Sequence, residues 1–147
     1  MKRSFSPPVL YKLFIALMLV KVILPIRRQI LFPFNLIGII LLVAGSYVAM
    51  GTKKMFKRTQ TPISHFARPS KLHTNGIFRF TRNPMYLGIA IGLAGIALLT
   101  GTIYNIIFAF VYLLLMDIFF IRHEEKQLYQ VFGETYRNYK KATRRWF

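Results

Sequence analysis

Four long apolar stretches, separated by polar segments, dominate the hydrophobic pattern of the chain. They cover residues 9–24, 31–50, 85–101 and 103–121. Each is close to the roughly 17–25 residues that an α-helix needs to cross a bilayer. Lys12 and Lys21 interrupt the first stretch. The pattern predicts an all-α, polytopic membrane protein with about four transmembrane helices, folded as one integral-membrane domain over residues 1–147.

The first apolar stretch follows basic residues, as the hydrophobic part of a signal peptide does. However, two lysines interrupt it and no small-x-small cleavage site follows. We therefore interpret it as a retained anchor.

Small residues mark the predicted helix contacts. Gly88, Gly92 and Gly95 recur at i, i+4 and i+7 in the third stretch, and Gly38 and Gly45 make a similar smooth stripe in the second. Such stripes allow two helix backbones to approach closely in lipid, which favours helix packing as their role. The third and fourth stretches are joined by little more than "TGT", which predicts a tight helical hairpin.

Composition and charge place the chain in a membrane and orient it. Hydrophobic residues make up 54% of the sequence, and the formal net charge is +17. Lys and Arg concentrate at the N-terminus, in segment 51–84 and after residue 122, whereas the opposite loops hold only Arg27 and Arg28. Because basic residues stay inside, both termini and the middle loop are predicted to be cytoplasmic, at the inner membrane. Membrane lipids, and no nucleic acid, are the expected partners.

Cysteine is absent and the three histidines are scattered. This composition excludes disulfides and thiol nucleophiles, and no metal site is expected.

Carboxylates are rare, and three of the four fall within nine residues. Asp117 lies inside the fourth stretch, where an ionisable group needs a partner; we expect either a pair with Lys12 or independent contact with the interface. If the helix continues unbroken into the tail, Asp117, Ile121 and Glu124 share one face.

Glu124 and Glu125 stand side by side where the fourth stretch ends. Neighbouring side chains on a helix diverge by about 100°, so the two do not flank one bond as an acid/base pair. A metal site lacks matching His or Asp residues. A solvated helix face and a site for a ligand cation both remain open.

A second polar concentration lies at residues 71–88, directly before the third stretch. Thr74-Asn75-Gly76 predicts a turn, and Pro84 can begin the following helix. Taken alone this is a cytoplasmic turn with a helix start. Arg79, Arg82, Asn83 and Tyr86 could also hold a carboxylate, hydroxyls and an aromatic base.

The two motifs together resemble a known family. "GIFRFTRNPMYLG" followed by "RHEEKQLYQVFGETYRNYKK" is similar to the isoprenylcysteine carboxyl methyltransferase and phospholipid methyltransferase superfamily of integral membrane enzymes. The resemblance covers residues 71–141, with motifs at 71–88 and 122–141. Asn83 stands where the eukaryotic branch has His, and Phe78 replaces a frequent Tyr.

The resemblance implies that S-adenosylmethionine binds at the cytoplasmic end of the hairpin. It assigns these residues to the cofactor pocket: Leu72, His73, Thr74, Phe78, Asn83 and Tyr86. Gly88 is expected to allow close approach, and Glu124 to accept from the cofactor with Glu125 beside it. A carboxylate pair in a basic neighbourhood suits the sulfonium and ammonium of this cofactor.

The expected reaction is methyl transfer to a lipophilic acceptor that enters from the bilayer. An isoprenylcysteine-like carboxylate is already anionic and needs no general base, which suits a site poor in titratable groups. A phospholipid amine must lose a proton, for which Asp117 or a Glu is the candidate. Arg122 is the candidate catalytic residue, positioning an anionic acceptor, or else a positive-inside anchor.

Two rival functions remain. Membrane enone or sterol reductases have a related-looking C-terminal half and use NADPH, although paired carboxylates would repel its 2′-phosphate. A non-enzymatic, cationic lipid-binding protein explains the net charge but not the placement of Glu124 and Glu125.

The C-terminal tail is predicted to form an amphipathic cytoplasmic helix at the membrane interface. Tyr136 and Tyr139 share one of its faces, and Trp146 and Phe147 could anchor at the headgroups. Alternatively, the tail caps the cofactor pocket.

Overall fold

The computed structural model describes residues 6–23, 29–30, 32–61 and 69–146, without the side chains of residues 21–23. Throughout these ranges the regular structure is helical. The main helices are α1 (Pro7–Ile23), α2 (Ile37–Arg58), α3 (Pro84–Thr100), α4 (Ile103–Met116) and α5 (Arg122–Ala142). Short 3-10 turns lie at Phe34–Leu36 and Gly76–Arg79, and a π-helical turn, Asp117–Ile121, joins α4 to α5.

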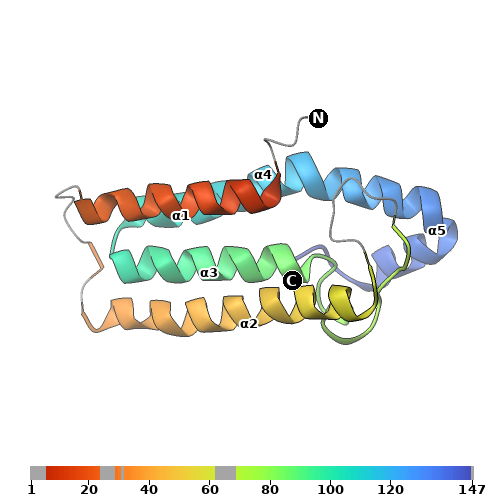
Figure 1. The fold of residues 1–147 in the computed structure, drawn as a ribbon, viewed down its shortest axis with the longest axis horizontal. Helices are drawn as coiled ribbons and strands as arrows, with labels where there is room; N and C mark the ends of the chain where they lie inside the picture. Colours follow the sequence, from red (N-terminus) through yellow and green to blue (C-terminus); the bar gives the residue numbers. More distant parts are fainter. Residues whose placement is uncertain (1–5, 24–28, 31, 62–68, 147) are drawn as a thin grey trace.

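Helix α3 is the centre of the bundle. It lies between α1 and α2, and α4 runs behind α1 (Figure 1). Met18, Leu93, Tyr112 and Met116 are fully or almost fully buried where α1, α3 and α4 meet. Phe14 meets Tyr112 edge to face, with ring centroids 5.9 Å apart. This core fixes the hairpin that carries both motifs at one end.

Helices α2 and α3 are packed backbone to backbone. A Cβ added at Gly88 would lie 2.7 Å from Gly45 O and 2.7 Å from Ala49 N, and one at Gly95 would lie 2.6 Å from Gly38 O. No side chain fits into such contacts. The predicted glycine stripes therefore act in helix packing, as small residues do in lipid.

The outer surface of the bundle exposes large apolar side chains, as expected of a membrane protein. On α2, Ile40, Val43, Tyr47 and Met50 are all more than 60% exposed. Two helices, Phe34–Arg58 and Ile103–Ala142, are long and apolar enough to cross a bilayer, while Pro7–Val20 and Pro84–Thr100 are apolar but shorter. The all-helical fold is confirmed, and the four-span arrangement stays a prediction.

Several predicted boundaries can be compared with the helices. Helix α2 continues to Arg58, eight residues beyond the predicted end of the apolar stretch, because the basic residues that follow are good helix formers. Helix α3 begins at Pro84 as expected. The hairpin is as tight as predicted, because Gly101 ends α3 at φ 71° and α4 begins two residues later. Some residues of the sequence predictions lie outside the described ranges, namely Leu24, Leu31, Lys2, Arg3, Arg27 and Arg28. The side chain of Lys21 is likewise not described.

The end of the chain folds back on the bundle. Gly133 has φ 50° and ψ −122°, which breaks α5 and reverses its direction. The segment after it therefore returns to the start of α3, beside the loop that precedes that helix (Figure 1).

Candidate active site

A pocket lies at the end of the bundle where α2 ends and α3 begins. The loop before α3 contributes Leu72, His73 and Phe78 to its lining, and α5 contributes Glu124, Glu125 and Tyr139. The motifs at 71–88 and 122–141 thus meet at one cavity, although 33 residues of hairpin separate them.

Glu124 faces the pocket and is tied to the third helix. The hydroxyl of Tyr86 donates to Glu124 Oε1 over 2.9 Å. Tyr86 is buried at the start of α3, so its position is fixed by the bundle core. The bond links the two motifs directly.

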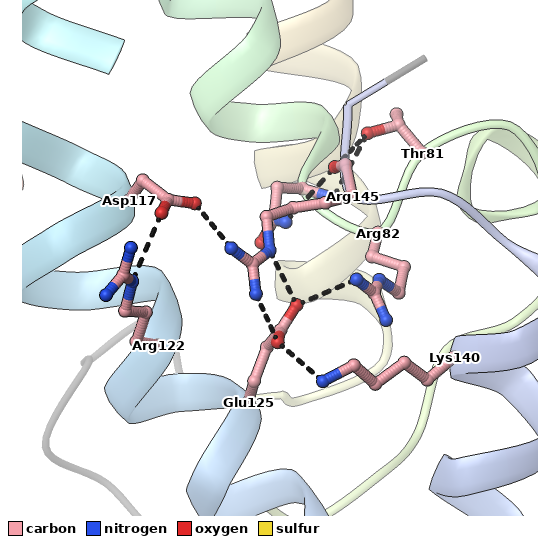
Figure 2. Close-up of polar contacts among 8 residues, drawn as sticks. Thr81, Arg82, Asp117, Arg122, Glu125, Lys140 and Arg145 are labelled. Carbon is pink, nitrogen blue, oxygen red and sulfur yellow. Dashed lines mark hydrogen bonds and ion pairs between the residues drawn. The ribbon is translucent and has the colours of Figure 1, made fainter. Parts of the chain in front are cut away.

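Glu125 is the centre of a charge cluster and is buried (Figure 2). Arg145 donates to both carboxylate oxygens, over 3.1 and 2.8 Å, while Arg82 and Lys140 approach to 3.1 and 3.3 Å. Burial by itself raises the pKa of the Glu125 carboxyl. The hydrogen bonds and charges of Arg145, together with Arg82 and Lys140, outweigh that effect and hold this pKa below its ordinary value. Glu125 is therefore ionised and fully engaged.

Asp117 joins the same cluster, which corrects one expectation. Its carboxylate accepts from Arg145 Nη1 over 2.9 Å and from Arg122 Nε over 3.3 Å. The predicted pair with Lys12 is therefore wrong, because the returning tail brings a guanidinium to Asp117. Arg145 bridges Asp117 and Glu125, as Figure 2 shows.

The π-helical turn also changes which Glu shares a face with Asp117. A π turn holds more residues than an α turn, so it displaces the following helix by about one residue. Glu125, eight residues after Asp117, thereby replaces Glu124 as the carboxylate aligned with it. The prediction from an unbroken α-helix, that Asp117 and Glu124 share one face, is wrong for this reason.

Arg82 carries hydrogen-bonding groups that the described residues leave unused. Its side chain is only 8% exposed, and Nη2 pairs with Glu125. Nε and Nη1 are buried without a hydrogen-bond partner among the described residues, and Arg82 lines the pocket. Leaving such donors unsatisfied is costly, so the pocket suits a ligand with an anionic group.

An aromatic wall, formed by Phe56, His73 and Phe78, closes another side of the pocket. The three rings lie 5.5 to 5.8 Å apart between centroids. Tyr139 donates to Phe78 O over 2.7 Å and so fixes this wall to the returning part of α5. Burial raises the pKa of Tyr139 to about 12, which keeps this phenol a donor at physiological pH.

His73 is held within the wall by Thr61, whose Oγ1 lies 2.9 Å from His73 Nε2. Burial, and then the charge of Lys71, lower the pKa of His73. The imidazole is therefore neutral at physiological pH.

The residues expected at the cofactor divide into two groups. Those that line the pocket are Leu72, His73, Phe78, Asn83, Tyr86, Glu124 and Glu125. Thr74, Gly88 and Arg122 do not line it. Gly88 lies at the α2–α3 contact instead, and the Arg122 side chain is 65% exposed beside Asp117. The geometry gives Arg122 no contact with the pocket.

Sequence reasoning gave the tail as a cap of the pocket only as an alternative to an interfacial helix, and it missed Arg145. Tyr136 and Tyr139 line the pocket, so the tail caps it, and Trp146 packs against the core. Arg145 had no local signal, since one more arginine in a basic segment is not distinctive. Phe147 lies outside the described residues.

An apolar groove adjoins the pocket. Its floor is the face of α3 that carries Gly88 and Gly92, and its walls are α1, with Tyr11 and Ile15, and α2, with Leu42 and Met50. Lys53, near the end of α2, also lines it. Met85 and Tyr86 line the groove and the pocket alike, so the two spaces meet there.

Comparison with known proteins gives one result for function. The family model for phospholipid methyltransferases matches residues 34–135, more than half of the chain, and the matched range includes α2, the hairpin, Glu124 and Glu125. No curated protein and no solved structure matches the chain.

Proposed function

The chain belongs to the phospholipid methyltransferase family, and we propose that it transfers a methyl group from S-adenosylmethionine to a membrane lipid at the cytoplasmic face. The observation that carries this proposal is the junction at Met85 and Tyr86, where a charged pocket meets an apolar groove. A polar methyl donor and a lipid can approach each other there, one from water and the other from the bilayer.

The pocket suits S-adenosylmethionine group by group. When bound, this cosubstrate supplies an activated methyl group on a sulfonium. Its cationic part suits Glu124, a carboxylate that lines the pocket. Its carboxylate suits the unpaired donors of Arg82, and its adenine suits the aromatic wall.

Asn83 and Tyr86 shape the pocket through bonds within the protein. The Asn83 amide donates to Arg145 O over 3.2 Å, and Tyr86 donates to Glu124. We assign them the task of holding the tail and Glu124 in place, which positions the groups that meet the ligand.

The groove supports a lipid acceptor with acyl chains. It is lined mainly by apolar side chains between α1 and α2, and Lys53 at its cytoplasmic end suits a phosphate. A headgroup at the junction would meet Tyr86 and Glu124. A negative carboxylate there favours an ammonium headgroup over an anionic one, so we propose a phospholipid amine rather than an isoprenylcysteine carboxylate.

An ammonium headgroup must lose its proton before the nitrogen can form a bond to the methyl carbon. Asp117 and Glu125 are held in ion pairs with Arg145 and further cations. Glu124 and the neutral imidazole of His73 both line the pocket, and they are the groups we propose for accepting this proton.

The positions of the basic segments support a cytoplasmic site. The end of α2, the loop before α3 and the returning α5 all gather at one end of the bundle (Figure 1). These segments carry most of the Lys and Arg residues, which stay on the cytoplasmic side of a membrane.

Calorimetric titration with S-adenosylhomocysteine tests the proposal. The wild-type protein should bind it saturably in lipid nanodiscs, and Glu124→Gln should weaken binding roughly tenfold to a hundredfold, because a charge-assisted contact is lost. Glu134→Gln is the matched control, since Glu134 is exposed and pairs with Arg137 outside the pocket. Methylation of phosphatidylethanolamine and of an isoprenylcysteine analogue then identifies the acceptor.

Absence of binding by the folded wild-type protein, in detergent and in nanodiscs, would contradict the methyltransferase proposal. Titration with NADPH then separates the two rivals: saturable binding indicates a reductase, and no binding indicates a lipid-binding protein.

A further inference from the structure

The guanidinium of Arg82 is held at one nitrogen and unused at the other two. Nη2 lies 3.1 Å from Glu125 Oε1, whereas Nε and Nη1 are buried and make no hydrogen bond with the described residues. Nε and Nη1 lie on opposite sides of the planar guanidinium, so each can donate a separate charge-assisted hydrogen bond to a carboxylate or phosphate oxygen. Arg82 therefore keeps two separate donors for an oxyanion, in a side chain that lines the pocket.

The ion pair of Arg82 Nη2 with Glu125 depends on a segment from the far end of the chain. We call residues 143–146 the C-terminal strap. Its backbone accepts three hydrogen bonds from the residues directly before α3: Arg82 N to Arg144 O at 3.1 Å, Thr81 Oγ1 to Arg145 O at 2.9 Å, and Asn83 Nδ2 to Arg145 O at 3.2 Å. The strap thus lies directly against the backbone of Arg82.

The side chain of Arg145 completes this arrangement (Figure 2). It grips Glu125 with Nε and Nη2, and Asp117 with Nη1. Glu125 is therefore fixed by Arg145 at both carboxylate oxygens, and through Oε1 it can fix Arg82 in turn. Lysine could not replace Arg145, because an ammonium lacks the planar fork that meets two carboxylates at once.

Charge in the cluster favours an added anion. Arg82, Arg122, Lys140 and Arg145 outnumber their carboxylate partners Asp117 and Glu125, and including Glu124 still leaves an excess of positive charge.

We propose that an unpaired donor of Arg82, Nε or Nη1, binds a carboxylate or phosphate group of the ligand, and that Arg145 is the positioning residue that holds the Arg82 guanidinium toward the pocket through Glu125. The inference rests on the proposed function for its two sources of such a group. These are the carboxylate of S-adenosylmethionine and the phosphate of a phospholipid.

The experiment compares two ligands that differ only in the anionic group. Affinities for S-adenosylhomocysteine and for its decarboxylated analogue are measured in nanodiscs with the wild-type protein, Arg82→Gln, Arg145→Gln and Arg145→Lys. The KM for phosphatidylethanolamine is measured with the same proteins. Arg137→Gln is the matched control, because Arg137 makes an exposed pair with Glu134.

If the group is the cosubstrate carboxylate, Arg82→Gln and Arg145→Gln weaken S-adenosylhomocysteine binding roughly tenfold to a hundredfold and leave the analogue unchanged. If it is the lipid phosphate, both affinities are kept and the KM rises by a similar factor. In either case Arg145→Lys recovers only part of the loss, and Arg137→Gln behaves as wild type.

Equal weakening of both ligands without a change in KM would reduce Arg82 to a structural residue and overturn the inference, as would no change in any of the three quantities. An effect of Arg82→Gln that Arg145→Gln does not reproduce would overturn the role of Arg145.

A folded wild-type protein that binds neither nucleoside contradicts the proposed function instead. The oxyanion site is then judged with inorganic phosphate, whose binding both glutamine variants must weaken if the inference holds.

Discussion

The pocket and the groove share Met85 and Tyr86, yet different forces hold them together. Ion pairs and hydrogen bonds between distant parts of the chain build the pocket, as between Thr81 and Arg145. The groove is built from apolar side chains and glycine, whose contacts have no preferred direction. A polar ligand therefore meets fixed partners in the pocket, whereas a lipid chain meets a surface that accepts many shapes.

Helix α3 serves both regions, so disturbing its packing should have the largest effect. A side chain at Gly45 would collide with the backbone of Gly88 and Gly92, which cannot move without separating α2 from α3. Gly45→Leu should abolish the native fold, since overpacking a tight contact costs about 1–3 kcal/mol or more. Thermal unfolding and size-exclusion chromatography in detergent measure this loss.

Gly51→Leu is the control, because Gly51 is exposed and a Cβ there meets nothing within 4 Å. A Gly45→Leu protein with wild-type melting and S-adenosylhomocysteine affinity would show that the close contact of α2 and α3 is unimportant.

A change at Gly92 should separate the two regions. A Cβ there meets only Leu42 Cδ1, at 3.9 Å, so a larger side chain would extend into the groove without forcing α2 and α3 apart. Gly92→Leu should raise the KM for long-chain phospholipid on the order of tenfold, which corresponds to about two methylene groups denied burial. The affinity for S-adenosylhomocysteine should stay unchanged.

Kinetics with long-chain and short-chain phospholipids check this expectation, with Gly51→Leu again as the control. Equal KM values for Gly92→Leu and the wild-type protein would remove the groove as the acceptor site.

Lowering the pH should destabilise the charge cluster of the pocket and leave the groove unaffected. The loss of stability should be smallest near neutral pH. The pKa of Glu125 is lowered in the folded protein relative to its ordinary value of 4.5. The unfolded chain therefore takes up this proton first, and the stabilisation is present above pH 4.5 and lost as the pH falls through the lower folded pKa. Unfolding midpoints between pH 7 and pH 3 measure the loss.

Glu125→Gln should remove this part of the acid dependence, and Glu134→Gln should not, because Glu134 and its partner Arg137 are both exposed. The same pH profile in wild type and Glu125→Gln would contradict the role of the charge cluster.

Much of the architecture could be predicted because it depends on local pattern. Apolar runs predicted the helices, Pro84 the start of α3, and "TGT" the hairpin turn. The glycine stripes indicated the contact of α2 and α3. Each of these features is set by neighbouring residues and by the hydrophobicity of a short window.

The candidate site could be predicted only in part. The two motifs predicted a cavity at the end of the hairpin, and seven of the ten residues named from them line it. Glu124 accepts from Tyr86, whereas Glu125 pairs with Arg145. This difference was not predictable, because the π turn at Asp117–Ile121 has no evident local signal.

The sequence by itself determined a helical membrane protein with two polar motifs at one end of a hairpin, since composition and periodicity depend on residues close together in the chain. Only the tertiary structure decided that Arg145 holds Glu125 and Asp117, that Arg82 keeps two unpaired donors, and that the groove meets the pocket at Tyr86. These features arise where Gly133 turns the tail back across the start of α3 and where helices cross. Contacts of that kind depend on distances in space that no local pattern encodes.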